Sequence, residues 1–360
     1  MEPVDLDMGN SLHYRRHSQS YQSPISTKLR YRKRSHSITS HHHLAAQLAS
    51  KIKMIEHADK TGFLRYMDDQ VHEKWDAAKA AMVGAQRLLQ FHELPSEWQE
   101  NEYVLSGYRF YQNSRDCLRS IFMLHNETMN IWSHLLGFIF MAGLSAYGFN
   151  RHFPEASFND RMVFMAFCVA ALKCLFCSSI YHTFICHSHF TVKAFTATLD
   201  YIGIAILITA SILVTEYYGF YCRPTPQFRY MIFTTVVGSV GIISPFFKCW
   251  DTKQYRPLRV AVFLLIAFSS IVPVMHLIRL NGLASTMEFF ELAGVSVMMY
   301  LFGVIIYVNR FPERLFPGKF DFAGLTSHAI WHVFVCLGIY FHYLASLNFY
   351  SQRLSYGCRL

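Results

Sequence analysis

Two histidines four residues apart, His328 and His332, stand at the start of an apolar stretch that continues to about Leu347. In an α-helix, residues i and i+4 lie on the same face, one above the other. Ionisable side chains are costly inside a membrane and usually have a function there. Imidazole is a common zinc ligand. The pair therefore predicts part of a zinc site whose remaining ligand comes from elsewhere in the chain.

Other polar residues border two further apolar stretches. His182 ends one of them, with Ser178 one helical turn earlier, and Asp200 begins the next. If the chain crosses a membrane seven times, these positions and the start of the last stretch all lie on the side of the N-terminus. Three imidazoles with an open fourth position recur in catalytic zinc sites, and a nearby carboxylate can orient the bound water or take its proton. We therefore predict the metal ligands His182, His328 and His332, and the catalytic residues Asp200 and Ser178.

A simpler interpretation is that each histidine satisfies a separate hydrogen bond within a helix bundle. For single histidines such as His134, His276 and His342, we favour this simpler interpretation. Lys173 lies nine residues before His182, which is about 13 Å along a helix and on the opposite face. We therefore do not expect Lys173 to join the metal site.

The composition indicates a membrane protein. Of 360 residues, 52% are hydrophobic and only 16% are charged, which is too apolar for an ordinary soluble protein. Residues 131–360 contain repeated apolar stretches of about 20 residues, the length that crosses a bilayer. Pro245 and Pro273 are expected to kink the fourth and fifth stretches. We predict an all-α membrane protein, a seven-transmembrane helix bundle with spans at about 131–149, 162–182, 199–220, 229–248, 259–279, 288–309 and 325–347.

Lysine and arginine residues in the loops predict the orientation. The loops after spans two, four and six hold eight of them, the loops on the other side hold five, and the N-terminal region adds more to the first side. We therefore predict a cytosolic N-terminus. The net charge of +9 fits membrane orientation and anionic lipid better than nucleic acid, so we expect no nucleic-acid partner. The eight cations are Lys193, Lys248, Lys253, Arg256, Arg259, Arg310, Arg314 and Lys319.

The sequence before the first span has two parts. Residues 1–60, rich in Ser, His, Arg and Lys, predict a disordered basic tail. Residues 61–130 predict a cytosolic juxtamembrane region with amphipathic helical segments. There, an apolar stripe from Val71 to Leu89, which includes Trp75 and Met82, is typical of a helix face that packs on a core or a partner. The zinc-binding core at 131–347 and a short C-terminal tail at 348–360 complete the expected domains.

The sequence predicts neither a disulfide framework nor a cleaved signal peptide. Several of the nine cysteines fall inside apolar spans, where a thiol behaves as a small hydrophobic group, so we expect no disulfide framework. Cys174 and Cys177 match a C-x-x-C pattern, but they lie within one helical stretch and have no second pair. No apolar run precedes Ile131, so we expect no cleaved signal peptide.

A series of motifs, in order from residue 94 to 347, resembles the progestin and adipoQ receptor family, which includes the adiponectin receptors. The resemblance does not extend to the first 90 residues. Within the family, the segments around Arg109, Glu127 and His182 look most similar to those of a Golgi-resident member that tethers Raf kinase. The matching segments are Glu102–Arg109, Ser120–Phe122, Asn126–Gly137, Ser178 with His182, Leu199–Ile204, Pro312–Arg314, Pro317–Phe320, and Ser327-His328 with His332.

The resemblance implies a seven-helix bundle with a cytosolic N-terminus, in the Golgi or the plasma membrane. It also implies zinc on the three predicted histidines, with Asp200 and Ser178 around the metal-bound water. For adiponectin-type relatives it implies a weak ceramidase-like activity, which cleaves a lipid amide into a fatty acid and a sphingoid base. Membrane lipids, either sphingolipid or fatty acid, are then the expected partners.

Two functions of different classes remain open. The leading hypothesis is a zinc-containing, receptor-like membrane protein of lipid-linked signalling that hydrolyses a lipid amide inside the membrane. The alternative is a non-catalytic Golgi scaffold, in which zinc braces three helices and residues 1–130 hold a cytosolic signalling kinase. A G-protein-coupled receptor is a third option, but the expected topology and the lack of an Asp-Arg-Tyr-like signature after the third span disfavour it.

Overall fold

Helices form all the regular secondary structure in the part of the chain that the structure describes. The computed structural model describes residues 75–152, 156–247, 249–250 and 252–358. The predicted basic tail, residues 1–60, lies outside these ranges. The chain divides into two units, 1–66 and 67–360, and every described residue belongs to the second.

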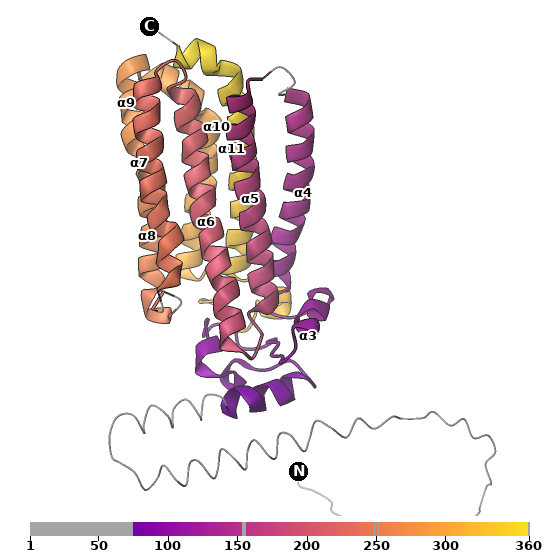
Figure 1. The fold of residues 1–360 in the computed structure, drawn as a ribbon. Helices are drawn as coiled ribbons and strands as arrows, with labels where there is room; N and C mark the ends of the chain where they lie inside the picture. The colour runs from indigo at the N-terminus through magenta and orange to yellow at the C-terminus, as the bar shows by residue number, and fades with distance from the viewer. Residues whose placement is uncertain (1–74, 153–155, 248, 251, 359–360) are drawn as a thin grey trace, which may run out of the picture. The chain divides into compact units, whose positions relative to one another are not determined.

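Seven helical spans in the described ranges are long and apolar enough to cross a membrane, which confirms the predicted number. In hydrocarbon every backbone N–H and C=O must be paired within the protein, and a helix achieves this within one segment. The seven stand side by side, with the end of the last helix at one end of the bundle and the short helix α3 (Ser114–Arg119) at the other (Figure 1). The spans are α4 (Thr128–His152), α5 (Phe158–Phe184), α6 (Phe190–Gly219), α7 (Pro224–Ile243), α8 (Arg256–Phe268) continued by α9 (Ile271–Asn281), α10 (Leu283–Asn309) and α11 (Ser327–Gly357).

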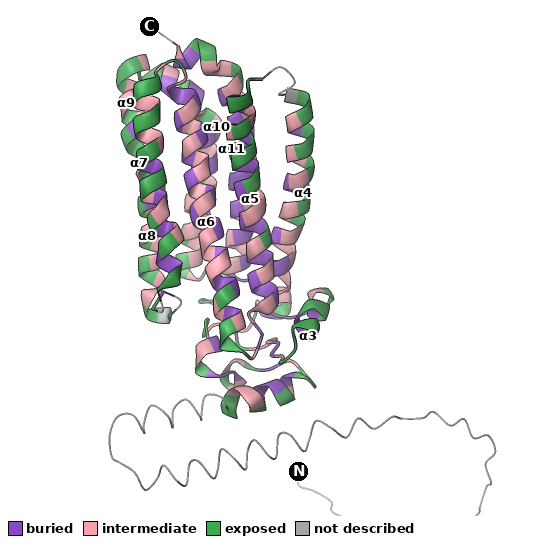
Figure 2. Cartoon of the chain, in the orientation of Figure 1, coloured by how far each residue is buried: buried purple, intermediate pink, exposed green. Residues whose placement is uncertain are grey.

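Two of these helices form the centre of the bundle. Half of the most apolar window of α5 and of α6 is buried (50% each), whereas only 17% is buried in the α8–α9 span. Figure 2 shows the same contrast, with exposed residues along the outer side of α7 and α8. Large apolar side chains such as Phe140, Phe233 and Ile305 stay exposed on the bundle, where lipid would cover them. Residues that meet at α5 and α6 are therefore shielded from both water and lipid.

The third span starts well before its predicted beginning at residue 199. Helix α6 begins at Phe190, so Asp200 lies ten residues inside the helix instead of at its first turn. Lys193, which the orientation count placed in a loop, is a buried residue of α6 and forms an ion pair with Glu100 at 2.9 Å. This partner removes the cost of burying the ammonium group, so the helix can extend beyond the apolar stretch that the sequence analysis detected.

The two prolines act differently from each other. Pro273 interrupts the fifth span as predicted, because proline lacks an N–H group and its ring clashes with the carbonyl four residues earlier. The break falls at Ser269 and Ser270, between α8 and α9. The kink expected at Pro245 is wrong, because α7 ends at Ile243 and Pro245 lies in the 3-10 turn that follows.

The juxtamembrane region packs differently from the predicted stripe. Residues 75–84 are helical, but Trp75 and Met82 of the stripe are 64% and 63% exposed. The face that packs inward consists of small residues around Ala81 and Gly84. A Cβ at Gly84 would lie 2.3 Å from the carbonyl oxygen of Phe110, so only glycine allows this approach. Close backbone contact, which periodicity of large apolar residues does not report, selects this face.

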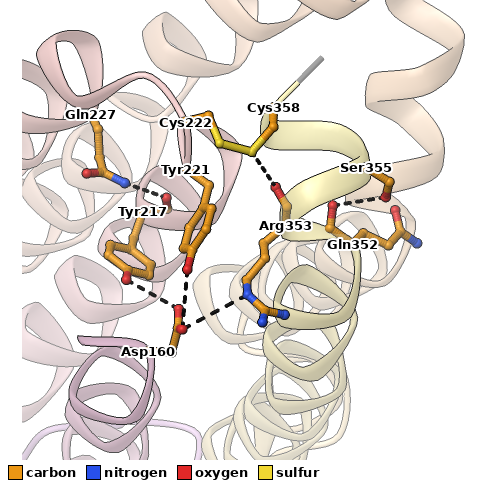
Figure 3. The surroundings of a disulfide bond; sticks show 9 residues. All are labelled: Asp160, Tyr217, Tyr221, Cys222, Gln227, Gln352, Arg353, Ser355 and Cys358. Atoms are coloured by element: carbon orange, nitrogen blue, oxygen red, sulfur yellow. Dashed lines mark hydrogen bonds and ion pairs between the residues drawn. A yellow bond between two sulfur atoms is a disulfide. The ribbon is translucent and has the colours of Figure 1, made fainter. Parts of the chain in front are cut away.

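A disulfide between Cys222 and Cys358 joins the end of α6 to the end of α11 (Figure 3), and the sequence analysis did not predict it. Beside it, the carboxylate of Asp160 on α5 is buried, at 1% exposure. It accepts a hydrogen bond from the Tyr217 hydroxyl at 3.2 Å and lies 4.0 Å from the Arg353 guanidinium. Three helices are thus linked at the bundle end that lies away from α3.

Candidate metal centre

The first turns of α11 present the histidine pair. Glu313, which is fully buried, accepts hydrogen bonds from the Ser327 N–H at 2.8 Å and from the Ser327 hydroxyl at 2.5 Å. These bonds satisfy donors that a helix N-terminus leaves unpaired, and a carboxylate there also complements the helix dipole. The helix therefore begins at Ser327, and His328 and His332 follow one turn apart on one face.

The last turn of α5 brings His182 to the same place. One ligand atom from each of His182, His328 and His332 lies within 4.8 Å of the others. Nε2 of His182 and Nε2 of His328 are 3.1 Å apart. Two ligands of a tetrahedral zinc ion, each at about 2.0–2.1 Å, are separated by roughly 3.3 Å. The predicted convergence is confirmed, and the three side chains fit one metal ion.

Hydrogen bonds on the opposite ring nitrogens favour this use of Nε2. His182 Nδ1 lies 2.8 Å from the Glu127 carboxylate, and His332 Nδ1 lies 3.1 Å from the Asn130 carbonyl oxygen. Both acceptors require a protonated Nδ1, which leaves the lone pair on Nε2. Metal-binding histidines usually donate their other N–H in this way. These two histidines are thus oriented to bind a cation through Nε2.

The two predicted catalytic residues lie beside the histidines. Asp200 is 8% exposed and Ser178 is 2% exposed, and both line the same cavity as the three imidazoles. The Ser178 hydroxyl donates a hydrogen bond to the Asp200 carboxylate. Asp200 is not among the three side chains whose ligand atoms converge. It therefore lies next to the ligand set and not within it.

The three histidines that were expected to form separate hydrogen bonds, His134, His276 and His342, differ in their surroundings. His342 Nε2 lies 3.1 Å from the Ser211 carbonyl oxygen, and His276 Nδ1 lies 3.1 Å from the Tyr230 hydroxyl. The ring of His134 stacks on His332, with centroids 3.7 Å apart and planes 10° from parallel. For His276 and His342 the simpler interpretation is confirmed. For His134 it is wrong, because among the described residues neither ring nitrogen has a hydrogen-bond partner and the ring stacks on a predicted metal ligand.

Glu127 is a site residue whose position the sequence reasoning missed. The sequence analysis places it only in a segment that resembles the family, Asn126–Gly137, and gives it no role in the site. Burial alone would raise its pKa, but hydrogen bonds from His182 and Asn130 hold the pKa of the carboxyl below its usual value. An acidic residue directly before an apolar span was the available signal, but nothing in the sequence connects it to a histidine 55 positions later.

A cavity of about 870 Å³ extends from the histidines into the bundle between α6, α8, α10 and α11. Along α6, its lining runs from Asp200 to Thr215, which is about 22 Å at 1.5 Å per residue. This length suits a long acyl chain. Away from the histidines the walls are mostly aliphatic and aromatic, with Leu207, Ile208, Phe263, Leu264, Val297 and Leu301 among them.

Comparison with known proteins agrees with this architecture. A family model described as haemolysin-III related matches residues 122–343. The chain belongs to this family, that of the progestin and adipoQ receptors. The mouse progestin and adipoQ receptor family member 3 is 33% identical to it over 278 residues, covering 76% of this chain and 89% of the relative.

Two further members of the progestin and adipoQ receptor family extend the comparison. The Drosophila melanogaster adiponectin receptor protein is 36% identical over 296 residues, covering 81% of this chain and 64% of the relative. The Caenorhabditis elegans progestin and adipoQ receptor-like protein 1 is 34% identical over 275 residues, covering 76% and 63%. The chain therefore spans less than two thirds of the length of these two relatives.

Proposed function

We propose that this chain is a zinc-dependent hydrolase of lipid amides, similar to a ceramidase, that acts within the membrane in lipid-linked signalling. The single observation that carries the proposal is the convergence of three imidazoles within 4.8 Å at the end of a long apolar cavity. Three neutral imidazoles suit zinc, and a set of three leaves a coordination position open.

The residues around the imidazoles fit hydrolysis. The three imidazoles would hold a zinc ion, which would supply a coordinated water with a pKa of about 7 and polarise a carbonyl group. Asp200 would orient the attacking water and take its proton, and Ser178 would hold the carboxylate by its hydrogen bond. Hydrolysis adds the water oxygen to the acyl carbon, breaks the C–N bond and transfers a proton to the amine. The products are a fatty acid and a sphingoid base.

The cavity supports a lipid as substrate. Its lining beyond Asp200 is mostly apolar and long enough for an acyl chain, and its charged residues come from the segments at the histidine end. An N-acylated sphingolipid would place its amide at the imidazoles and its acyl chain between α6, α8 and α10. Polar groups at one end of an otherwise apolar pocket are what fixes the orientation of such a ligand.

We further propose that the histidines face the cytosol, in a Golgi or plasma membrane. Support comes from the cations in the loops on that side and from the disulfide at the other end, because disulfides persist in oxidising compartments. The described residues of the juxtamembrane region could also present a surface to a cytosolic kinase. In that scaffold alternative, zinc would only brace α5 and α11.

Metal analysis of the purified full-length protein tests the site. We expect about one zinc ion per wild-type chain and loss of zinc in His328→Ala. His342→Ala removes a buried histidine of the same helix outside the cluster, so it should keep the metal. Stoichiometric zinc in His328→Ala would overturn the proposed centre.

Turnover of a ceramide with a labelled acyl chain, in lipid nanodiscs, separates the two functions. Asp200→Ala should keep zinc and lose the release of fatty acid, because the ligands remain and the proton acceptor is gone. No release by the zinc-loaded wild-type protein would contradict the hydrolase and favour the scaffold, whereas release at the wild-type rate by zinc-loaded Asp200→Ala would remove Asp200 from the mechanism.

A further inference from the structure

The imidazole of His182 is held from the side that faces away from the other two ligands. Its Nδ1 lies 2.8 Å from Oε2 of Glu127, and its Nε2 lies 3.1 Å from Nε2 of His328. The side chains of His182 and Glu127 are 3% and 15% exposed. A charge-assisted hydrogen bond in such shielded surroundings is strong and fixes the direction of the ring.

Glu127 is itself held by its neighbours. Its Oε1 accepts a hydrogen bond from the Asn126 amide at 3.1 Å, and its Oε2 accepts one from the Asn130 amide at 2.7 Å. Its backbone N–H donates to Nδ1 of His125 at 3.0 Å. Burial lowers the pKa of His125 to about 3, so its ring stays neutral and can accept this bond. The carboxylate therefore has one defined position.

We propose that Glu127 is a positioning residue of the metal centre, which keeps His182 protonated at Nδ1 and directs its Nε2 lone pair towards the ion. This inference rests on the zinc site in the proposed function. It adds a residue that precedes the first transmembrane helix to a centre otherwise built from α5 and α11. Carboxylates in this position typically contribute a factor of about 10–100 to metal affinity.

Two other roles for Glu127 fit the geometry less well. It is not a ligand, because it is not among the three side chains whose ligand atoms lie within 4.8 Å of one another. It is poorly placed as a general base, since both of its oxygens already accept hydrogen bonds from neighbouring side chains. Asp200, which also lines the cavity, remains the better proton acceptor.

The main chain of His182 is held by the same juxtamembrane segment. The buried guanidinium of Arg109 donates to the His182 carbonyl oxygen at 2.8 Å and to the Ser120 hydroxyl at 2.5 Å. Arg109 therefore fixes the backbone at the end of α5, while Glu127 fixes the ring. Both residues lie outside the core that was predicted to start at residue 131.

Zinc affinity of the full-length protein in nanodiscs, measured by competition with a chromogenic chelator, tests this role without any substrate. Glu127→Ala should bind zinc about 10–100-fold more weakly than wild type. Glu127→Gln keeps the shape and one acceptor but loses the charge, so its loss should be smaller. The matched control is Glu216→Gln, another buried carboxyl, which bonds to Thr234 and lies sixteen residues, about 24 Å, beyond Asp200 along α6.

The visible spectrum of the cobalt-substituted protein gives a second measurement that a purely structural role would not change. The spectrum of Glu127→Gln should shift relative to wild type, while that of Glu216→Gln should not. Wild-type zinc affinity in Glu127→Ala, together with an unshifted spectrum in Glu127→Gln, would overturn the positioning role alone. A wild-type chain that binds no zinc would instead overturn the metal centre of the proposed function.

Discussion

Two carboxylates near the histidines differ in their hydrogen-bond partners. Glu127 accepts bonds from His182, Asn126 and Asn130 and is therefore committed to holding a ring. Asp200 has the Ser178 hydroxyl and faces the cavity. Groups with different surroundings can take different roles in one site, as acid–base chemistry in enzymes requires. The hydrogen-bond partners thus suit Glu127 for positioning and Asp200 for proton transfer.

Ser178 tests this division at the residue scale. Replacing Ser178 with Ala removes one hydrogen bond to a carboxylate, which is worth about 1.5–3 kcal/mol. We expect hydrolysis of a labelled ceramide to slow by about tenfold or more, with zinc content unchanged. Ser178→Thr keeps the hydroxyl and should retain more activity. Equal rates for Ser178→Ala and wild type, both zinc-loaded, would show that Asp200 does not depend on this bond.

At the element scale, the start of α11 depends on the tight turn before it. Gly324 has a φ of +71°, a conformation that only glycine adopts at no cost. A Cβ at this position would lie 1.8 Å from the carbonyl oxygen of Asn126. The turn therefore packs against Asn126, the residue before Glu127. This contact sets the position of the helix that bears His328 relative to the segment that holds His182.

Gly324→Ala should change the position of α11 relative to the segment around Glu127. The backbone conformation alone costs about 1–3 kcal/mol for a residue with a Cβ, and the clash adds to it. We expect a lower thermal midpoint in detergent and weaker zinc binding. Gly143→Ala on α4 is the control, since nothing lies within 4 Å of its Cβ and alanine is the better helix former. A midpoint and zinc affinity equal to wild type would mean that the turn can rearrange freely.

At the scale of the whole molecule, one helix connects two chemically different ends. α11 has 31 residues, with His328 in its first turn and the disulfide cysteine Cys358 directly after its last residue. The two lie about 45 Å apart along the helix. One end carries a candidate metal centre, and the other carries a disulfide, a buried aspartate and an arginine (Figure 3). If the helices cross a membrane, these ends face different compartments.

Removing the disulfide should weaken the bundle without emptying the metal site. Cys222→Ser with Cys358→Ser opens a loop of 136 residues, and such a bond is typically worth about 2–4 kcal/mol. We expect a lower thermal midpoint by fluorescence, with zinc content unchanged because the histidines lie at the other end. The same midpoint in the double variant and wild type, both under non-reducing conditions, would contradict a stabilising role.

A membrane-impermeant maleimide, applied to cells in which only the plasma membrane is opened, tests the proposed orientation. Cys249 is an exposed free cysteine between α7 and α8 and should be labelled at once. In Cys358→Ser, the free thiol of Cys222 should react only after the internal membranes are opened if the protein is in the Golgi, and already in intact cells if it is in the plasma membrane. Immediate labelling of Cys222 with protection of Cys249 would reverse the orientation.

The sequence by itself determined the number of spans, the helical architecture and the three metal-ligand candidates. These properties follow from local patterns: apolar stretches of bilayer length, histidines at i and i+4, and the parity of the crossings. The break near Pro273 belongs to the same class, because proline acts on its own helix. Apart from the parity, which needs the count of all the spans, each of these can be read within about 25 neighbouring residues, the length of one span.

Only the tertiary structure decided the contacts between distant parts of the chain. It paired His182 with Glu127, placed Asp200 ten residues inside α6, and joined Cys222 to Cys358. It also buried Lys193, which the sequence analysis had counted as a loop cation. The physical reason is that a buried charge is stable only beside its particular partner, and that a disulfide needs two cysteines brought to the right separation. Both depend on how the helices pack. Local periodicity contains no information about which residue, dozens of positions away, completes the pair.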